Sequence, residues 1–200
     1  MSATNKAGPG SGELVLPPFS LDVQALDLGG DAKAVGLELL ETESREPVRG
    51  KEAAEIWAAL LAALAGSDCF VVDFFSHVER VAEFCKTREI VFRKAAERCL
   101  VLAQPSQEQL RQLFERFEGE TFGLRAGAVA EAADTPLENE LSRRGLDAYQ
   151  AAYSRYTFCA VCEPEEGWVT LLSETLWASE VIRRARPAVQ PFDIYIARPH

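Results

Sequence analysis

The sequence predicts a single α/β domain: a mixed sheet of five or six strands flanked by helices, ending in a β-hairpin, a helix and a strand. Short β-rich runs alternate along the chain with segments of helical periodicity, as they do in strand–helix–strand units. The C-terminal quarter contains a hairpin signal, and a hairpin makes its two strands antiparallel. The 200 residues are 48% hydrophobic and 26% charged, which is the composition of a globular protein rather than of a disordered or fibrous one.

The N-terminal part of the chain predicts a leader followed by one domain. Residues 1–12 are mainly Gly, Pro, Ser and Ala and bury too little apolar surface to offset the entropy of ordering, so we expect a disordered leader. No long linker interrupts residues 13–200, which we therefore expect to form a single α/β domain. Between residues 35 and 39 apolar side chains alternate with Gly36 and Glu38, and this period of two predicts a half-buried strand.

The next segment predicts a buried helix, a strand and a second helix. Residues 51–65 contain strong helix formers with apolar side chains on nearly every face, which is typical of a helix buried on most sides. Residues 69–75 are rich in β-branched and aromatic side chains and predict a strand. Residues 76–79 match a capping box, which predicts the start of a helix. Residues 89–98 fit either a strand and turn or a further helix, and periodicity does not decide between them.

The middle of the chain repeats this order of elements. Residues 99–103 are a second apolar run, and residues 106–109 form another capping box that opens a helix. Residues 121–124 predict a third strand, so two successive strand–helix–strand passages favour a parallel or mixed sheet. Residues 126–134 give no clear pattern. A helix is expected to begin at Thr135, because Pro occupies the first helical position after it.

The last quarter of the chain predicts the hairpin, the last helix and the last strand. Two β-rich runs, residues 156–162 and 168–172, are joined by a turn with Pro early and Gly late. Ser173 can cap the helix that follows, and residues 192–196 alternate as a strand does. The predicted inner face of that helix comprises Trp177, Ala178, Val181, Ile182 and Ala185.

The charge of the chain limits the kinds of partner it can have. It carries 31 acidic and 21 basic side chains, a net charge of −10, and this charge is spread evenly along the sequence. Binding to nucleic acid needs several Lys or Arg contacts with phosphates, so a field of this sign disfavours it. Another protein with a neutral or basic surface is the expected partner, because the two potentials would be complementary.

The sequence also predicts a cytoplasmic protein that does not enter a membrane. The longest apolar run, residues 56–65, is about half of what a helix needs to cross a bilayer. The N-terminal segment lacks the apolar core and cleavage site of a signal peptide. The chain contains 5 cysteines, an odd and modest number that differs from the dense disulfide framework of small secreted domains.

Cys159 and Cys162 form the one short motif associated with metal or redox chemistry. A C-x-x-C pair can be a redox centre or half of a zinc site, so a metal role is an alternative for these two residues. They lie within a predicted strand, however, and strand positions three apart point to opposite faces. Buried structural thiols are therefore the preferred interpretation, and no cofactor is predicted.

Asp73 is the strongest candidate for a catalytic residue. It lies near the end of a predicted strand that leads into a capped helix, and ligands of open α/β sheets collect at such ends. A metal-dependent hydrolase or nuclease would need further carboxylates there, and Asp68, Glu120 and Glu79 are conceivable. Nothing in their spacing requires them to converge, so this enzyme remains the alternative hypothesis.

The leading hypothesis is a non-catalytic, acidic protein-interaction module: an adaptor, regulator or inhibitor of another protein. The chain contains no phosphate-binding glycine loop and no nucleophile-elbow motif. A docking patch would be expected to include exposed aromatic side chains. The candidates for such a patch are Trp57, Trp168 and Tyr149.

Overall fold

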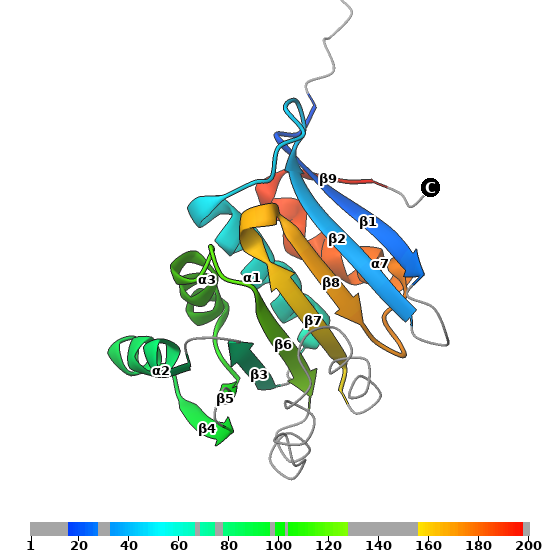
Figure 1. Cartoon of the computed structure of the whole chain (residues 1–200). Coiled ribbons are helices and arrows are strands. Elements are labelled where there is room, and N and C mark those ends of the chain that lie inside the picture. Colours follow the sequence, from blue (N-terminus) through cyan, green and yellow to red (C-terminus); the bar gives the residue numbers. More distant parts are fainter. Residues whose placement is uncertain are drawn as a thin grey trace, which may run out of the picture.

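One mixed sheet forms the centre of the molecule. The computed structural model describes residues 16–27, 33–66, 69–74, 78–96, 99–102, 104–127 and 156–197. In these ranges nine strands form a single sheet, and the helices pack on one face of it (Figure 1). The predicted α/β class and the C-terminal hairpin, helix and strand are confirmed. The sheet has nine strands where the sequence predicted five or six, and the predicted leader lies outside the described residues.

The strands are antiparallel to their neighbours at every pairing except one. Their spatial order is β4 (Phe92–Ala96), β5 (Cys99–Leu102), β3 (Cys69–Phe74), β6 (Phe122–Gly127), β7 (Phe158–Glu163), β8 (Trp168–Leu172), β2 (Lys33–Glu41), β1 (Phe19–Asp27) and β9 (Ile194–Ala197). The exception is the parallel pair of β1 and β9 at one edge. The hairpin turn between β7 and β8 is a short 3-10 helix, η2 (Pro164–Glu166), closed by a left-handed Gly167.

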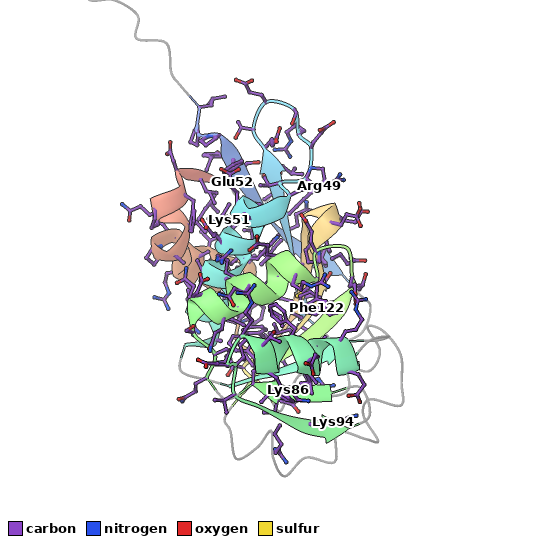
Figure 2. The ribbon with its side chains drawn as sticks, turned by 90° about the vertical axis from the view of Figure 1, so that its left-hand side faces the viewer. Arg49, Lys51, Glu52, Lys86, Lys94 and Phe122 are labelled. Carbon is purple, nitrogen blue, oxygen red and sulfur yellow. The ribbon has the colours of Figure 1, made fainter. Side chains whose placement is uncertain are left out.

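Four helices are described, and α1 (Gly50–Ala65) lies at the centre of their layer. It packs against α3 (Gln107–Arg116) on one side and α7 (Ala178–Val189) on the other. The remaining helix, α2 (Val78–Thr87), lies beside α3 (Figure 2), where the rings of Phe84 and Phe117 meet edge to face at a centroid distance of 5.6 Å. Within the described ranges, none of these helices is long and apolar enough to cross a membrane.

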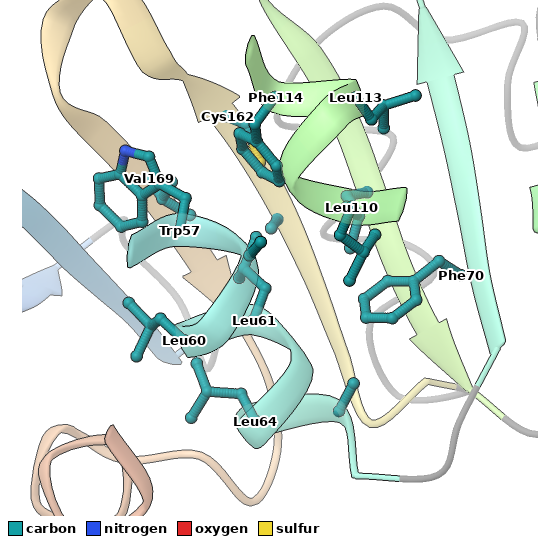
Figure 3. Close-up of a cluster of buried hydrophobic side chains, with 14 of the residues drawn as sticks. Trp57, Leu60, Leu61, Leu64, Phe70, Leu110, Leu113, Phe114, Cys162 and Val169 are labelled. Atoms are coloured by element: carbon teal, nitrogen blue, oxygen red, sulfur yellow. The ribbon is translucent and has the colours of Figure 1, made fainter. Parts of the chain in front are cut away.

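The core lies between α1 and the sheet. Trp57, Leu60 and Leu64 of α1 are fully buried, and Figure 3 shows them with side chains from the strands and from α3, such as Val169 and Phe114. Each such side chain contributes roughly 1.5–3 kcal/mol through removal of its apolar surface from water. The prediction that residues 51–65 form a helix buried on most sides is confirmed.

Alternation along the strands gives the sheet two different faces. On β2, Leu37 and Leu39 belong to the core beneath the helices, whereas Ala34 and Glu38 lie on the opposite face. This confirms the period of two predicted for that strand. The opposite face carries no helix among the described residues, and we call it the helix-free face.

The structure settles two local questions near the middle of the chain: the type of element over residues 89–98 and the capping box before α3. The segment left open between strand and helix forms strand β4, which pairs antiparallel with β5. The capping box before α3 is confirmed. The backbone N–H of Gln109 donates to Ser106 Oγ at 3.2 Å, and the backbone N–H of Ser106 donates to the side-chain Oε1 of Gln109 at 2.9 Å. The capping residue Ser76 and the helix expected from Thr135 lie outside the described residues.

The start of α7 differs from the prediction. The helix begins at Ala178, and Trp177 is its N-cap residue with 51% of its surface exposed, so the placement of Trp177 on the inner face was wrong. Ser173 does not cap α7 itself. Its Oγ accepts hydrogen bonds from the amide N–H groups of Thr175 (3.2 Å) and Leu176 (3.1 Å), which holds the turn between β8 and the helix. That turn rotates Trp177 outward, away from the core.

Candidate functional site

The two cysteines of the C-x-x-C motif lie on opposite faces of the sheet, as predicted. Both are on β7 and fully buried, with Cys162 in the core beneath the helices and Cys159 on the helix-free face beside Tyr156 and Leu172. Burial raises the pKa of the Cys162 thiol well above its ordinary range. The two sulfur atoms therefore do not share a ligand site.

The carboxylates proposed to surround Asp73 are not brought together by the described residues. Glu120 Oε1 accepts from Arg80 Nη1 at 3.1 Å, and the Glu79 carboxylate is bound by Lys94. Asp68 and the side chain of Asp73 lie outside the part of the chain that the structure describes. Across the described ranges, no three His, Cys, Asp or Glu side chains form a group that could hold a metal ion.

The topological reason for proposing Asp73 was also wrong. The backbone of Asp73 lies in β3 opposite Gly123 of β6 and Cys99 of β5, and both of these neighbours are antiparallel to β3. Ligands gather at the carboxyl ends of strands when neighbouring strands run in the same direction. Here the neighbouring strands present their amino ends at that edge, so the argument from parallel sheets does not apply.

The three aromatic residues proposed for docking have different outcomes. Trp57 is 0% exposed in the middle of α1, so its assignment to a docking surface was wrong. Its apolar ring completes the core at the position where the helix faces the sheet. Tyr149 lies outside the described residues. Trp168, the first residue of β8, is partly exposed on the helix-free face, where it can meet a partner.

The indole ring of Trp168 extends from β8 over the neighbouring strand β2. Its Nε1–H donates to Thr170 Oγ1 on the same strand at 2.8 Å. The far end of the ring lies next to Gly36 of β2, where a Cβ atom would come within 2.6 Å of Cζ2 and 2.7 Å of Cη2. Gly36 is therefore required for this ring position, because real Cβ atoms do not approach other atoms so closely. The residue as a whole is partly exposed.

Acidic side chains flank this ring in a row that crosses four strands. Asp22, Glu38, Trp168 and Glu163 are directly paired neighbours on β1, β2, β8 and β7. Neighbouring strands are about 4.8 Å apart, so an acidic residue lies one strand away on each side of Trp168, and the ring itself extends over β2, the strand that carries Glu38. We call the set of Glu38, Trp168 and Glu163 the Trp168 platform.

Part of the negative charge of this row is already neutralised. Arg45, from the loop after β2, donates to Asp22 Oδ2 at 2.6 Å and to Ser20 Oγ at 3.0 Å. Its hydrogen bond with Asp22 raises the pKa of the Arg45 guanidinium. Among the described residues, neither Glu38 nor Glu163 has a hydrogen bond or ion pair through its carboxylate. Arg45 also attracts Glu38 at longer range, so the charge of Glu38 is partly balanced, whereas that of Glu163 is not paired with a cation among the described residues.

Other aromatic rings of the chain already carry cations of their own. The Arg88 guanidinium lies 5.8 Å from the centre of the Phe84 ring, and Arg116 lies 5.7 Å from that of Phe117. Within the described part of the chain, the ring of Trp168 has no such cation. Its quadrupole and two adjacent carboxylates are suited to attract an ammonium or guanidinium group from outside.

Sequence reasoning found Trp168 but missed the residues around it. Glu163 could have been found, because it faces Trp168 across the predicted hairpin. Glu38 could not, because its position depends on the pairing of β2 with β8.

In comparisons with known proteins, no family model, no curated protein and no solved structure matches this chain. The candidate site accordingly rests on its own geometry.

Proposed function

We propose that this protein is a non-catalytic acidic module that binds another protein as an adaptor, regulator or inhibitor. We further propose that the Trp168 platform takes a Lys or Arg side chain of that partner. The observation that carries the proposal is the indole held against Gly36 by its hydrogen bond to Thr170, with Glu38 and Glu163 paired with Trp168 on the neighbouring strands.

The energetics of such a contact favour a cationic side chain. A cation over an indole contributes about 0.5–1 kcal/mol at an exposed site and about 2 kcal/mol when it is desolvated. Glu38 and Glu163 add attraction, and neither forms a hydrogen bond or ion pair through its carboxylate among the described residues, although Arg45 attracts Glu38 at longer range. The hydrogen bond to Thr170 fixes the ring, so little further ordering is needed on binding.

The overall charge supports a basic partner as well. A net charge of −10 creates a long-range field that raises the association rate of a positively charged protein. We propose that this encounter occurs in the cytoplasm, where thiols such as Cys85 and Cys162 stay reduced. Binding through the platform is expected to weaken as salt is added, because screening reduces the attraction between exposed charges.

The proposal can be tested by following the indole N–H signals in NMR spectra. The chain contains 3 tryptophans, whose signals can be assigned with single Trp→Phe variants. The titrants are an oligolysine peptide and an oligoglutamate peptide of equal length. We expect oligolysine to shift the Trp168 signal, with little change at the exposed Trp177 or the buried Trp57. Oligoglutamate is expected to leave all three signals unchanged.

Matched variants separate the platform from general charge attraction. Glu38→Gln and Glu163→Gln each remove one charge beside the ring, whereas Glu174→Gln removes one exposed charge elsewhere. The first two are expected to weaken oligolysine binding several-fold, and the third to leave it nearly unchanged. Equal effects of the three variants, or equal shifts at Trp168 and Trp177, would show that the peptide follows net charge alone and would contradict the proposal.

A further inference from the structure

The two edges of the sheet are protected to very different degrees. In the described sheet, β4 pairs only with β5, and β9 pairs only with β1. Edge β4 carries Lys94 (Figure 2) and also Arg93, both exposed, and its register with β5 is irregular after Lys94. Charged side chains and such irregularities oppose the addition of a further strand. Edge β9 is the uncharged sequence Ile-Tyr-Ile-Ala. It lacks the protection that the other edge has.

Edge β9 also presents an apolar surface. Ile194 and Ile196 pack against the core beneath α7, while Tyr195 pairs with Ser20 and lies on the helix-free face with 57% of its surface exposed. A groove of about 340 Å³ runs beside the strand, between β9, the end of α7 and Pro17. Figure 1 shows β9 next to β1, at the border of the sheet.

The unpaired backbone groups of β9 determine what kind of partner can bind at this edge. Alternate residues of a strand direct their N–H and C=O groups to opposite sides, so half of those of β9 point away from β1. In a monomer water satisfies these groups, and an extended chain can replace that water along the whole row. A protein partner that adds at this edge would therefore add as a β-strand.

We propose that this strand is β9 of a second copy of the same chain, paired antiparallel about a two-fold axis perpendicular to the sheet. Such an axis keeps the helices of both copies on the same side, so residues that face each other must lie on the same face of the sheet. Tyr195 then lies opposite Tyr195 or Ala197 of the other copy. The result is one continuous sheet with its aromatic contact on the helix-free face.

The charges around the edge favour this closed arrangement. The ionic groups beside the groove are Arg186 and Asp193, which balance each other. Joining β9 to β4 of the next copy would build an open filament, and Arg93, Lys94 and the irregularity of β4 oppose it. A two-fold pair uses β9 twice and leaves no unprotected edge. With 4 residues in each strand, the interface is small, so the dimer is expected to be weak and reversible.

The proposal can be tested by sedimentation velocity at a series of protein concentrations. The series extends to about 1 mM, because a weak dimer is populated only at high concentration. We expect a monomer–dimer equilibrium that strengthens with salt, because screening reduces the repulsion between two chains of charge −10 each. Tyr195→Lys is expected to weaken the dimer about tenfold, since like charges then face each other across the strands. Trp177→Lys, the same kind of change at an exposed aromatic residue of α7, is expected to leave it unchanged.

A charge exchange shows whether Tyr195 lies at the contact. Tyr195→Glu alone is also expected to weaken the dimer, and an equimolar mixture with Tyr195→Lys is expected to restore it. A monomer at every concentration would overturn the proposal, and so would a dimer that Tyr195→Lys leaves intact. A monomer whose β9 amide signals shift on adding an alternating Val–Lys peptide would assign the edge to a foreign strand instead. Because none of these measurements involves Trp168, their outcome is independent of the proposed function.

Discussion

Gly36→Ala is predicted to displace the indole ring of Trp168 and thereby destabilise the fold. The new Cβ would lie 2.6 Å from Cζ2 and 2.7 Å from Cη2 of the ring, and 3.3 Å from Leu26 Cδ1. Carbon atoms prefer separations of about 3.5–4.0 Å, so the ring must move by roughly 1 Å. The backbone beneath it cannot yield, because β2 is paired with a strand on each side.

The net cost follows from three contributions. Overpacking costs about 1–3 kcal/mol, and losing the hydrogen bond from Trp168 to Thr170 costs about 0.5–1.5 kcal/mol. Replacing a glycine in a strand returns about 0.5–1 kcal/mol through the entropy of the unfolded chain. Together these contributions lower the free energy of unfolding by about 0.5–4 kcal/mol. We expect Gly36→Ala to fall in the lower half of this range, because a ring that swings aside relieves part of the overpacking.

A double-mutant cycle isolates the contact between these two residues. With Trp168→Ala as background the clash is absent, so Gly36→Ala is expected to stabilise by about 0.5–1 kcal/mol. The coupling free energy between the two positions is then about 2 kcal/mol. Urea denaturation gives the four free energies of unfolding. Gly119→Ala is the control, because its Cβ would make only an ordinary contact, 3.7 Å from Glu165 Oε2.

Two results would refute this reasoning. One is a coupling free energy below about 0.5 kcal/mol, the scatter expected for independent sites. The other is an unchanged Trp168 indole N–H signal in Gly36→Ala, which would show that the ring does not lie over Gly36. The same variant should bind oligolysine more weakly if the platform functions as proposed, because the ring is displaced from its position over β2 beside Glu38.

Three further predictions concern the cap of α3, the core and an exposed ion pair. Ser106→Ala removes the capping box and should cost about 1 kcal/mol in urea denaturation, and no cost would contradict the cap. Trp57→Ala should cost about 3–5 kcal/mol. Trp57→Phe should cost much less, because Phe keeps an aromatic ring in the core and the indole N–H that is lost has no partner among the described residues; equal costs would contradict this. Hydrogen bonds from Arg183 and then Arg184 lower the pKa of Glu180 from 4.5 to about 2, so its contribution is present above pH 4.5 and is lost as the pH falls toward 2. The difference in urea midpoint between wild type and Glu180→Gln should therefore shrink over that range, and a constant difference would contradict the pair.

The elements that local signals define were predicted well. The capping box at Ser106, the buried helix over residues 51–65 and the hairpin around residues 163–167 were all found, because each depends on residues close together in the chain. Strand β1, with 9 residues, was not predicted, although Phe19, Leu21 and Val23 alternate with polar residues as they do in a half-buried strand; only its register depends on pairing with β2. Local pattern does not show which partner a strand will have.

The candidate site shows the same limit more sharply. Trp57 and Trp168 are alike in residue type, and both stand among apolar neighbours, yet one is in the core and the other on the helix-free face. The difference arises because α1 is covered on most sides, whereas the alternate residues of β8 have no helix over them. Asp73 illustrates the converse, since a plausible local position lost its significance once the neighbouring strands proved antiparallel.

The Trp168 platform combines two choices that are each unfavourable for stability alone. A glycine inside a strand weakens it, and a partly exposed indole leaves apolar surface in contact with water. Ala at position 36 together with a polar residue at 168 would avoid both costs without changing the pairing of β2 and β8. The two residues depend on each other, however, since the absence of a Cβ at Gly36 makes room for the ring, and the ring together with Leu26 covers the bare backbone. This mutual dependence holds the ring beside Glu38, which is the arrangement that the proposed binding of a cation requires, and among the described residues no cation lies over the ring.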